Sequence, residues 1–343
     1  MKKLLNTLFI LSDDVYLSLD GETVKVTYPD GTHKSVPLHI LESIVSFSYK
    51  GASPALMGEC SEKGIQLSFY SPKGAFLASV ANTTKGNVYL RREQYRLADQ
   101  DAEKLSISKN LIIGKLYNEK YVLLRCARDH GLRVDEEKLR NAAGNITRYM
   151  KDAGKTTDIN SLRGIEGNAA AEYFQVFDEM ILQNEEAFRF SGRNRRPPVD
   201  RTNALLSLAY SLLANDCGAA LYGAGLDPYV GFMHVDRPGR KSLALDLEEE
   251  LRSNYADRFV LTLINNRIIL PGDFIEKDNG AVFLTDDGRK KFFSEWQKRK
   301  KTVINHPFLN EKMEWGLVPH VQAMLLARFI RGDLEQYPPF FWK

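Results

Sequence analysis

Cysteine is scarce in this sequence. Its 343 residues include only three cysteines, Cys60, Cys126 and Cys217, which lie far apart. An odd number without a close pair argues against a disulfide framework and against a cysteine-rich zinc site. Free thiols persist in a reducing compartment, so we expect a cytoplasmic protein.

Long hydrophobic runs are missing as well. The apolar N-terminal segment is interrupted by Asn6, ends at Asp13 and Asp14, and lacks a small-residue cleavage site. We therefore do not interpret it as a signal peptide. No stretch approaches the ~20 consecutive apolar residues of a membrane-spanning helix, so we expect no membrane contact.

A large excess of charge of one sign is also absent. The 47 Lys and Arg residues against 44 Asp and Glu give a formal net charge of +3, which excludes a uniformly basic nucleic-acid coat. Residues 1–90 contain eight lysines, eight acidic residues and no arginine. Nucleic acid, if bound, must therefore contact local patches, and every arginine available for them lies in residues 91–343.

Several familiar catalytic motifs do not occur. The sequence has no G-x-x-x-x-G-K-[ST], no G-x-S-x-G and no H-E-x-x-H, and its six histidines lack zinc-finger spacing. The glycine-rich stretch at 222–231 follows a predicted helix rather than a strand and does not have the G-x-G-x-x-G spacing, so a dinucleotide site is not expected.

The first part of the chain has the pattern of a small β domain, which we place at residues 1–85. Short β-branched or aromatic runs predict strands, and Asp20-Gly21 and Asp30-Gly31 lie between such runs, as in tight hairpins. The pattern also permits a helix near 54–63. The predicted strands are Thr7–Ser12, Val15–Ser18, Thr23–Thr27, Ile44–Phe47, Ile65–Phe69 and Phe76–Val80.

The rest of the chain, residues 86–343, has a helical pattern with apolar residues three and four positions apart. Asn279-Gly280 is the centre of a short candidate hairpin. The helices are predicted near 91–106, 109–129, 134–153, 166–188, 200–223, 246–264 and 287–301. The predicted fold class is therefore α+β, with a small N-terminal β domain followed by a larger all-helical C-terminal catalytic domain.

Three segments of the larger domain carry candidate functional residues. Glu166 lies between two glycines at a predicted helix start, where the helix N-terminus stabilises a carboxylate that can also reach a cation. His234 ends an apolar stretch that follows a Gly/Pro loop. Asp246 and Glu249 lie three positions apart, so they share one face of a helix. Taken singly, these residues are more simply a capping glutamate, a core histidine and a solvated acidic face.

Taken together, they indicate a metal site. Two or three carboxylates and one imidazole without a thiolate suit Mg²⁺ or Mn²⁺ better than a structural zinc. Basic segments lie nearby in the sequence: 189–201 contains five arginines and 289–301 contains seven basic residues. Each basic run alone is usually a solvated face. Arginines near metal-binding carboxylates, however, are what phosphoryl transfer on a nucleic acid requires.

Four motifs in this order resemble the integrase subunit of CRISPR adaptation, the first of the CRISPR-associated proteins. The resemblance covers essentially the whole chain, and the C-terminal residues look like the type I-C branch. The motifs are R-G-I-E-G-N-A-A-A-E-Y-F (163–174), R-P-P-V-D-R-T-N-A-L-L-S-L-A-Y (196–210), G-L-D-P-Y-V-G-F-M-H (225–234) and L-A-L-D-L-E-E-E-L-R (243–252).

The resemblance implies roles for individual residues. Glu166, His234 and Glu249 match the metal ligands of the family, and Asp246 matches an accessory acidic position one helical turn before Glu249. The family often has proline after the arginine of the last motif, where this sequence has Ser253. The basic residues expected to hold DNA are Arg163, Arg193, Arg195, Arg196, Arg240, Lys241 and Arg252.

The resemblance also implies the activity and the partners. We expect a metal-dependent DNA endonuclease and integrase, in which the 3′-hydroxyl of a captured fragment attacks a phosphodiester of a CRISPR repeat. A homodimer is implied, as is a heterohexamer-like complex with a small ferredoxin-like second adaptation protein. Two alternatives stay open: a standalone nuclease that acts on branched DNA, and a non-catalytic DNA-binding assembly subunit.

Overall fold

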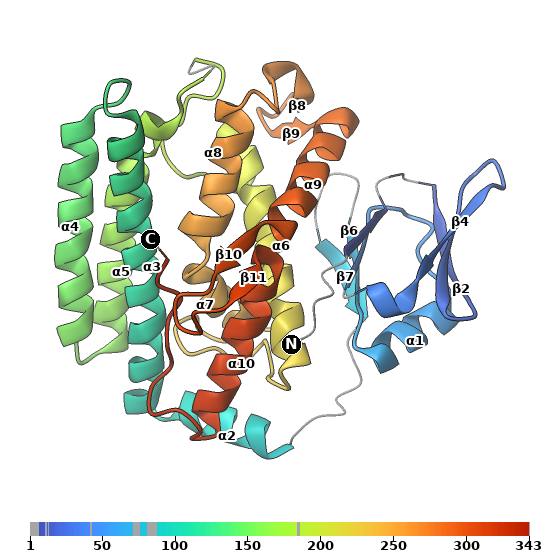
Figure 1. Ribbon diagram of the computed structural model, residues 1–343, viewed down its shortest axis with the longest axis horizontal. Helices are drawn as coiled ribbons and strands as arrows, with labels where there is room; N and C mark the ends of the chain where they lie inside the picture. Colours follow the sequence, from blue (N-terminus) through green and yellow to red (C-terminus); the bar gives the residue numbers. More distant parts are fainter. Residues whose placement is uncertain are drawn as a thin grey trace. The chain divides into compact units, whose positions relative to one another are not determined.

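The structure is a computed structural model that describes residues 7–10, 12, 14–41, 43–70, 76–80, 88–183 and 186–342 (Figure 1). Its chain divides into two compact units. One comprises Met1–Gly86 with Trp296–Thr302, and the other comprises Asn87–Glu295 with Val303–Lys343.

The smaller unit contains two sheets and a helix. A three-stranded antiparallel sheet has the order β2-β3-β4, and a four-stranded sheet has the order β1-β5-β6-β7, in which only β6 and β7 are antiparallel. The core between these elements includes fully buried Leu17, Val24, Ile44, Leu56 and Leu67. The strands are β1 (Thr7–Ile10), β2 (Tyr16–Asp20), β3 (Thr23–Thr27), β4 (His33–Pro37), β5 (Ser43–Ser46), β6 (Gln66–Tyr70) and β7 (Phe76–Val80).

Local sequence signals explain much of this unit. The two Asp-Gly turns connect β2 to β3 and β3 to β4, and Gly21 and Gly31 both have positive φ, as expected for tight turns. The helix α1 (Pro54–Lys63), expected near 54–63, begins after Ser53, whose side chain accepts a hydrogen bond from the Leu56 amide at 3.2 Å. The strand β4 was not predicted, because its mostly exposed residues lack a hydrophobic alternation.

The larger unit is built around long helices (Figure 1). The 30-residue helix α3 packs against α4 and α5, while α6 packs against α7 and α10. Leu205, Leu206 and Leu213 of α6 are fully buried. The helices are α2 (Val88–Asp99), α3 (Asp101–His130), α4 (Glu136–Lys155), α5 (Ile159–Gln175), α6 (Arg201–Gly223), α7 (Ser242–Glu249), α8 (Arg258–Asn265), α9 (Asp286–Lys301) and α10 (Val318–Ile330). The part of α9 from Trp296 onward is grouped with the smaller unit.

The helix α6 has the length and composition of a membrane span, but 56% of its most apolar window is buried inside the protein. A core helix passes the same test of length and composition. The packing of α6 against α7 and α10 therefore accounts for its apolar character.

The larger unit is not purely helical. It contains the hairpin of β8 (Phe274–Glu276) and β9 (Val282–Leu284), and a second pair formed by β10 (Val303–Asn305) and β11 (Lys312–Glu314). The first hairpin was expected from Asn279-Gly280, and Gly280 has a φ of 75°. The expectation of an all-helical domain is therefore corrected to a helical domain with two small hairpins, because three-residue strands give almost no periodic signal.

The last described residues, 337–342, which we call the C-terminal tail, lie against α3 and the end of α7. The side-chain nitrogen of Asn118, Nδ2, donates to the carbonyls of Glu250 at 2.8 Å and Phe340 at 2.6 Å. The side-chain oxygen, Oδ1, accepts from the Trp342 backbone amide at 2.9 Å. The Glu250 carboxylate accepts from the hydroxyl of Tyr337 and from the amide of Phe340. The tail therefore supports the helix that carries Asp246 and Glu249.

Candidate active site

Glu166 lies in the middle of a helix. The sequence placed it at a helix start, but α5 begins at Ile159, and its cap is Asp158, whose carboxylate accepts from the amides of Asn160 and Ser161. The helix N-terminus therefore does not stabilise Glu166, and this expectation was wrong. The two flanking glycines are ordinary helical positions with open space around them.

The loop before α7 is wrapped around one carboxylate. Asp246 is fully buried, and its oxygens accept hydrogen bonds from the amides of Phe232 at 2.6 Å, Met233 at 3.0 Å and His234 at 2.9 Å. Gly231 permits this close approach, because a Cβ there would lie 2.9 Å from an Asp246 oxygen. The backbone of this loop is thus fixed to α7.

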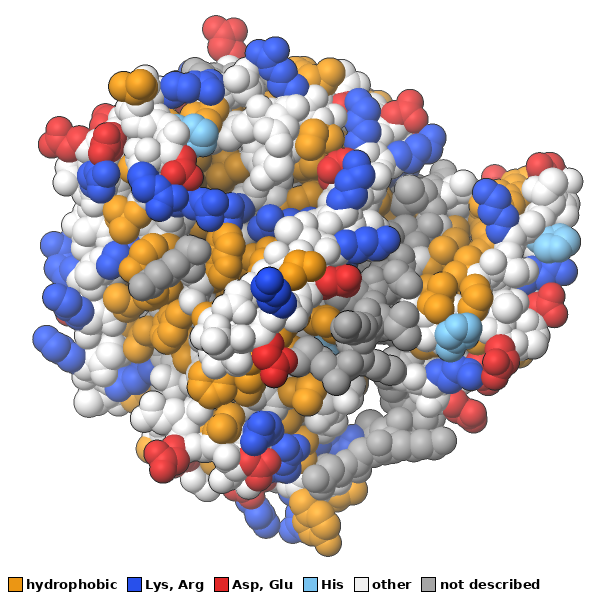
Figure 2. All heavy atoms as spheres, in the orientation of Figure 1, with side chains coloured by type: hydrophobic (Ala, Val, Ile, Leu, Met, Phe, Trp, Pro, Cys, Tyr) orange, Lys and Arg blue, Asp and Glu red, His pale blue; other side chains and the backbone are white. Residues whose placement is uncertain are grey.

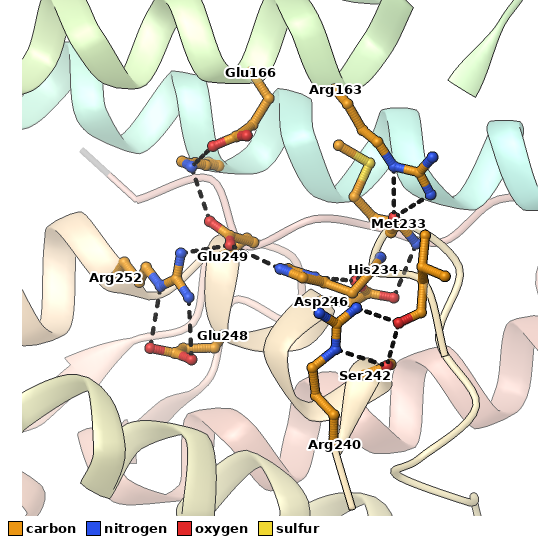
Figure 3. A network of polar contacts seen from close by, with 12 residues as sticks. Arg163, Glu166, Met233, His234, Arg240, Ser242, Asp246, Glu248, Glu249 and Arg252 are labelled. Carbon is orange, nitrogen blue, oxygen red and sulfur yellow. Dashed lines mark hydrogen bonds and ion pairs between the residues drawn. The ribbon is translucent and has the colours of Figure 1, made fainter. Parts of the chain in front are cut away.

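The same carboxylate orients His234. Its Oδ1 atom lies 2.7 Å from Nδ1 of the imidazole, and Nε2 lies 3.9 Å from Glu249 (Figure 3). Burial lowers the pKa of His234, but the hydrogen bond and charge of Asp246, together with the charge of Glu249, shift it upward overall. A hydrogen on Nδ1 leaves the Nε2 lone pair facing Glu249, which is the arrangement of a metal-binding histidine with a supporting carboxylate.

Glu249 is buried between two cations. Arg252 donates to its Oε1 atom, and the Lys115 ammonium lies 2.9 Å from Oε2. Burial raises the pKa of Glu249, but the charges of Arg252 and Lys115 outweigh this effect and lower the pKa to about 2. Glu249 is therefore ionised in the folded protein. Glu248 is also paired with Arg252, at 3.1 Å.

Lys115 joins Glu249 to Glu166. Its ammonium contacts a carboxylate oxygen of Glu166 as well as Glu249, and the lysine is only 4% exposed. Sequence reasoning missed this residue. The available signal was its place on α3 four residues after Leu111, in a row of buried positions, where a charged side chain needs a partner.

The order of these groups is visible in Figure 3, where Glu166, Glu249, His234 and Asp246 follow one another. Glu166 comes from α5, His234 from the loop, and Asp246 and Glu249 from α7. The sequence correctly expected Asp246 and Glu249 to share a face. Leu243, Leu247 and Leu251, in the same region of the chain, are fully buried.

The helix after α7 changes its pitch. Residues 252–257 form a π-helix, η3 (Arg252–Asp257), where a continuous helix over 246–264 was predicted. Asp257 is buried and accepts from the hydroxyls of Tyr173 and Tyr210. The Tyr210 ring lies near the guanidiniums of both Arg193 and Arg252. A local widening of this kind is frequent at functional sites.

The donor set can be tested against a divalent ion. Within the described parts of the chain, no three His, Cys, Asp or Glu side chains are arranged to hold a metal ion as they stand. The ammonium of Lys115 lies between two of the expected ligands. The chemistry nevertheless fits, because two carboxylates converge on a cation and His234 faces one of them at 3.9 Å, a separation compatible with ligand distances of ~2.0–2.2 Å.

Most of the expected DNA-binding residues have protein partners. Arg163 donates to the Met233 carbonyl, Arg193 to Asn203 and Ser207, and Arg240 to the Val235 carbonyl.

The structure places the other expected DNA-binding residues, Lys241, Arg195 and Arg196, in different surroundings. The Lys241 ammonium lies 5.9 Å from the centre of the Tyr222 ring. Arg195 and Arg196 are exposed. These two arginines are therefore the members of the group whose side chains are most open to solvent.

The basic run at 289–301 lies on α9, along which Lys and Arg side chains gather in Figure 2. Part of its charge is neutralised locally: Arg289 pairs with Asp286, Lys290 with Asp287 and Lys291 with Asp273. Surface pairs of this kind contribute little to stability, but they reduce the positive potential of the helix.

Comparison with known proteins gives a family match and full-length relatives. The family model described as "CRISPR associated protein Cas1" matches residues 8–298. The chain is 47% identical over 343 residues to "CRISPR-associated endonuclease Cas1 1" of Chlorobaculum tepidum, with 100% of both chains covered. It is 47% identical over 348 residues to "CRISPR-associated endonuclease Cas1 2" of Rhodospirillum rubrum, again with 100% of both covered.

Solved structures share the fold. A CAS1 protein from Thermotoga maritima superposes with a TM-score of 0.83 at 23% identity, covering 97% of this chain and 99% of the other. A casposase bound to its integration product gives 0.83 at 22% identity, covering 99% and 94%. A chain of a Cas6-RT-Cas1–Cas2 complex gives 0.82 at 24% identity, covering 100% of this chain and 36% of that one.

Proposed function

The chain belongs to the Cas1 family, and from this premise we propose that it is a DNA endonuclease and integrase that inserts captured DNA fragments into a CRISPR array. The observation that carries the proposal is the full-length identity to Cas1 endonucleases together with the convergence of Glu166, Glu249 and His234. In the proposed reaction, a 3′-hydroxyl attacks a phosphodiester and the 3′-oxygen of the repeat leaves, so one phosphodiester forms as another breaks.

Glu166, His234 and Glu249 would hold the divalent ion, for which Mg²⁺ or Mn²⁺ is the best match to hard oxygen and imidazole ligands. When bound, such an ion supplies charge neutralisation at the phosphodiester and activation of the attacking hydroxyl. The chain itself supplies the geometry. Asp246 fixes the imidazole and the loop, and Arg252 holds Glu248 and Glu249 on α7.

The proposed partners follow from the same family. DNA and Cas2 are proposed because Cas1 chains with this fold occur in a complex with Cas2 and in a complex with DNA. We further propose a homodimer, a heterohexamer-like assembly with the small second adaptation protein, a place in the type I-C branch, and a cytoplasmic location. The three free cysteines are in keeping with a reducing compartment.

Strand transfer tests the proposal. We expect His234→Ala and Glu249→Gln to abolish insertion of a DNA fragment into a supercoiled plasmid that carries a repeat, assayed with Mn²⁺. The matched control is His130→Ala, which removes an exposed histidine at the end of α3 and should leave activity unchanged. Both site variants should still bind DNA, because phosphate contacts supply most of that affinity.

The outcomes separate the alternatives. Full activity of either purified site variant would overturn the site assignment. Cleavage of branched DNA without any strand transfer by the wild-type chain would favour the standalone nuclease. DNA binding without cleavage and without strand transfer would favour a non-catalytic assembly subunit.

A further inference from the structure

The buried polar cluster around Glu249 contains more carboxyl groups than permanent cations. Five carboxylates face only two permanent cations, and four of these carboxylates are less than 5% exposed. A buried charge is expensive unless it is paired, so the position of each cation decides which carboxylates are ionised. The carboxylates are Glu119, Glu166, Asp246, Glu248 and Glu249, and the cations are Lys115 and Arg252.

The two cations have different attachments. Arg252 is held by Glu248 and Glu249 within one turn of its own helix region, so its position follows from α7 and η3. Lys115 comes from α3 and reaches across to Glu166 and Glu249 with a flexible side chain. Lysine carries its charge on four rotatable methylene groups, so its ammonium can move several ångströms while α3 stays in place.

Glu119 supplies a place for that ammonium to go. It is 3% exposed, and within the described residues its Oε2 atom is buried without a hydrogen-bond partner. It lies four residues after Lys115 on the same helix, the spacing at which lysine and glutamate side chains meet. Burial raises the pKa of Glu119 to about 8, although Lys115 lowers it. A nearer cation would favour the ionised carboxylate.

We propose that Lys115 is an internal competitor of the catalytic metal, holding Glu166 and Glu249 in the metal-free protein and moving to Glu119 when the divalent ion binds. This inference rests on the proposed metal site. It gives a role as the receiving carboxylate to Glu119, whose Oε2 atom has no hydrogen-bond partner in the described part of the chain. In this role Lys115 also keeps the like-charged Glu166 and Glu249 together before the metal binds, so the site does not have to form against their repulsion.

Mn²⁺ binding to the full chain, measured by isothermal titration calorimetry at constant pH and salt, tests the inference. We expect Lys115→Met to tighten Mn²⁺ binding by about tenfold or more, because the ion no longer displaces an ammonium from two carboxylates. We expect Glu119→Gln to weaken it by about threefold or more, because the displaced ammonium loses its acceptor.

The decisive comparison is the double variant. Removing any nearby charge changes metal affinity through space, so the single changes alone do not distinguish a switch from simple electrostatics. If Lys115 moves to Glu119, then Glu119→Gln should change affinity by less than about twofold once Lys115 is methionine. Equal effects of Glu119→Gln in both backgrounds, or unchanged or weaker binding in Lys115→Met, would overturn the inference.

Two further variants keep the result interpretable. If Lys115→Met does not fold, Lys115→Gln, which also removes the charge, replaces it in the single and double variants, and the same comparison applies. Glu249→Gln reports on the metal site itself. If Mn²⁺ binding depends on Glu249 but Glu119→Gln has the same effect with and without Lys115, the metal site stands and only the lysine switch is refuted. If Mn²⁺ binding does not depend on Glu249 in any variant, the metal site and the switch are both refuted.

Discussion

The carboxylate of Asp246 provides a sharp quantitative test, because one isosteric change disturbs several contacts at once. Its Oδ2 atom accepts from the amides of Phe232 and Met233, and its Oδ1 atom accepts from the amide of His234 and contacts the His234 ring. In Asp246→Asn, one of the two oxygens becomes an amino group. If the amino group replaces Oδ2, the amides of Phe232 and Met233 face another donor. If it replaces Oδ1, the His234 amide does so, and the His234 ring must adopt the tautomer in which Nδ1 accepts.

The magnitude follows from that geometry. An unsatisfied buried donor costs about 1–3 kcal/mol, so the one or two created by this change should lower the free energy of unfolding by about 3 kcal/mol. For a unit of this size, that corresponds to a fall in Tm of roughly 6–12 °C. A supporting carboxylate lost from a metal-binding histidine typically weakens metal affinity by ~10–100-fold. We expect both effects in the Asp246→Asn chain.

The assay combines urea unfolding of the purified chain with calorimetric titration of Mn²⁺. The matched control is Asp236→Asn in the same loop, where an exposed aspartate accepts a single hydrogen bond, from Gly231 at 3.0 Å. Its unfolding free energy should change by less than about 0.5 kcal/mol. If Asp246→Asn and Asp236→Asn behaved alike in both measurements, the role assigned to Asp246 would be refuted.

Two other predictions concern the surroundings of the site. Phe340→Ala should lower the free energy of unfolding by about 3–5 kcal/mol because the ring is fully buried, whereas Leu132→Ala at a fully exposed position should have little effect; equal chemical-unfolding curves would contradict this. His306, whose pKa burial lowers to about 4 from 6.5, binds its proton more weakly in the folded chain than in the unfolded one. The protein should therefore lose about 3 kcal/mol of stability as pH falls from about 6.5 to about 4, and His306→Gln should remove that part of the slope in urea unfolding across this range.

Local patterns predicted the β unit well, since turn chemistry and strand composition act over a few residues. The Asp-Gly turns and the helix at 54–63 were both confirmed. The start of α5 was missed because Gly164 and Gly167 looked like helix breakers. Their cost of about 1 kcal/mol each relative to alanine is outweighed by burial of Leu162, Ala169 and Tyr173 on the same helix.

The helix α10 was missed for a related reason. Its second residue, Pro319, tends to indicate a break, yet proline is tolerated in the first turn, where its missing N–H has no partner to lose. Nine residues of α10 are buried, and this packing defines the helix more strongly than the sequence pattern alone.

The site was predictable in part. Residues close in sequence, such as Asp246 and Glu249, were placed on a common face from spacing alone, and the structure agrees. Lys115 could not be placed, because its partner Glu166 lies 51 residues away. An ion pair between residues so far apart in the sequence depends on how α3 packs against α5 and α7, which no local sequence pattern encodes.

The attachment of the C-terminal tail to Asn118 has a consequence for the order in which the protein is made. The two residues that hydrogen-bond, Asn118 and Phe340, are separated by 222 positions. At ribosomal speeds of ~5–20 residues per second, α3 is synthesised about 10–45 s before the segment that holds it against α7. A nascent chain that has reached residue 330 already carries every expected metal ligand, as well as Asn118 and Gln322, which donate to Glu250. It still lacks Tyr337 and Phe340, which donate to the Glu250 carboxylate. The contacts of the C-terminal tail with α3 and Glu250 therefore form late, after all the residues of the candidate site have been synthesised.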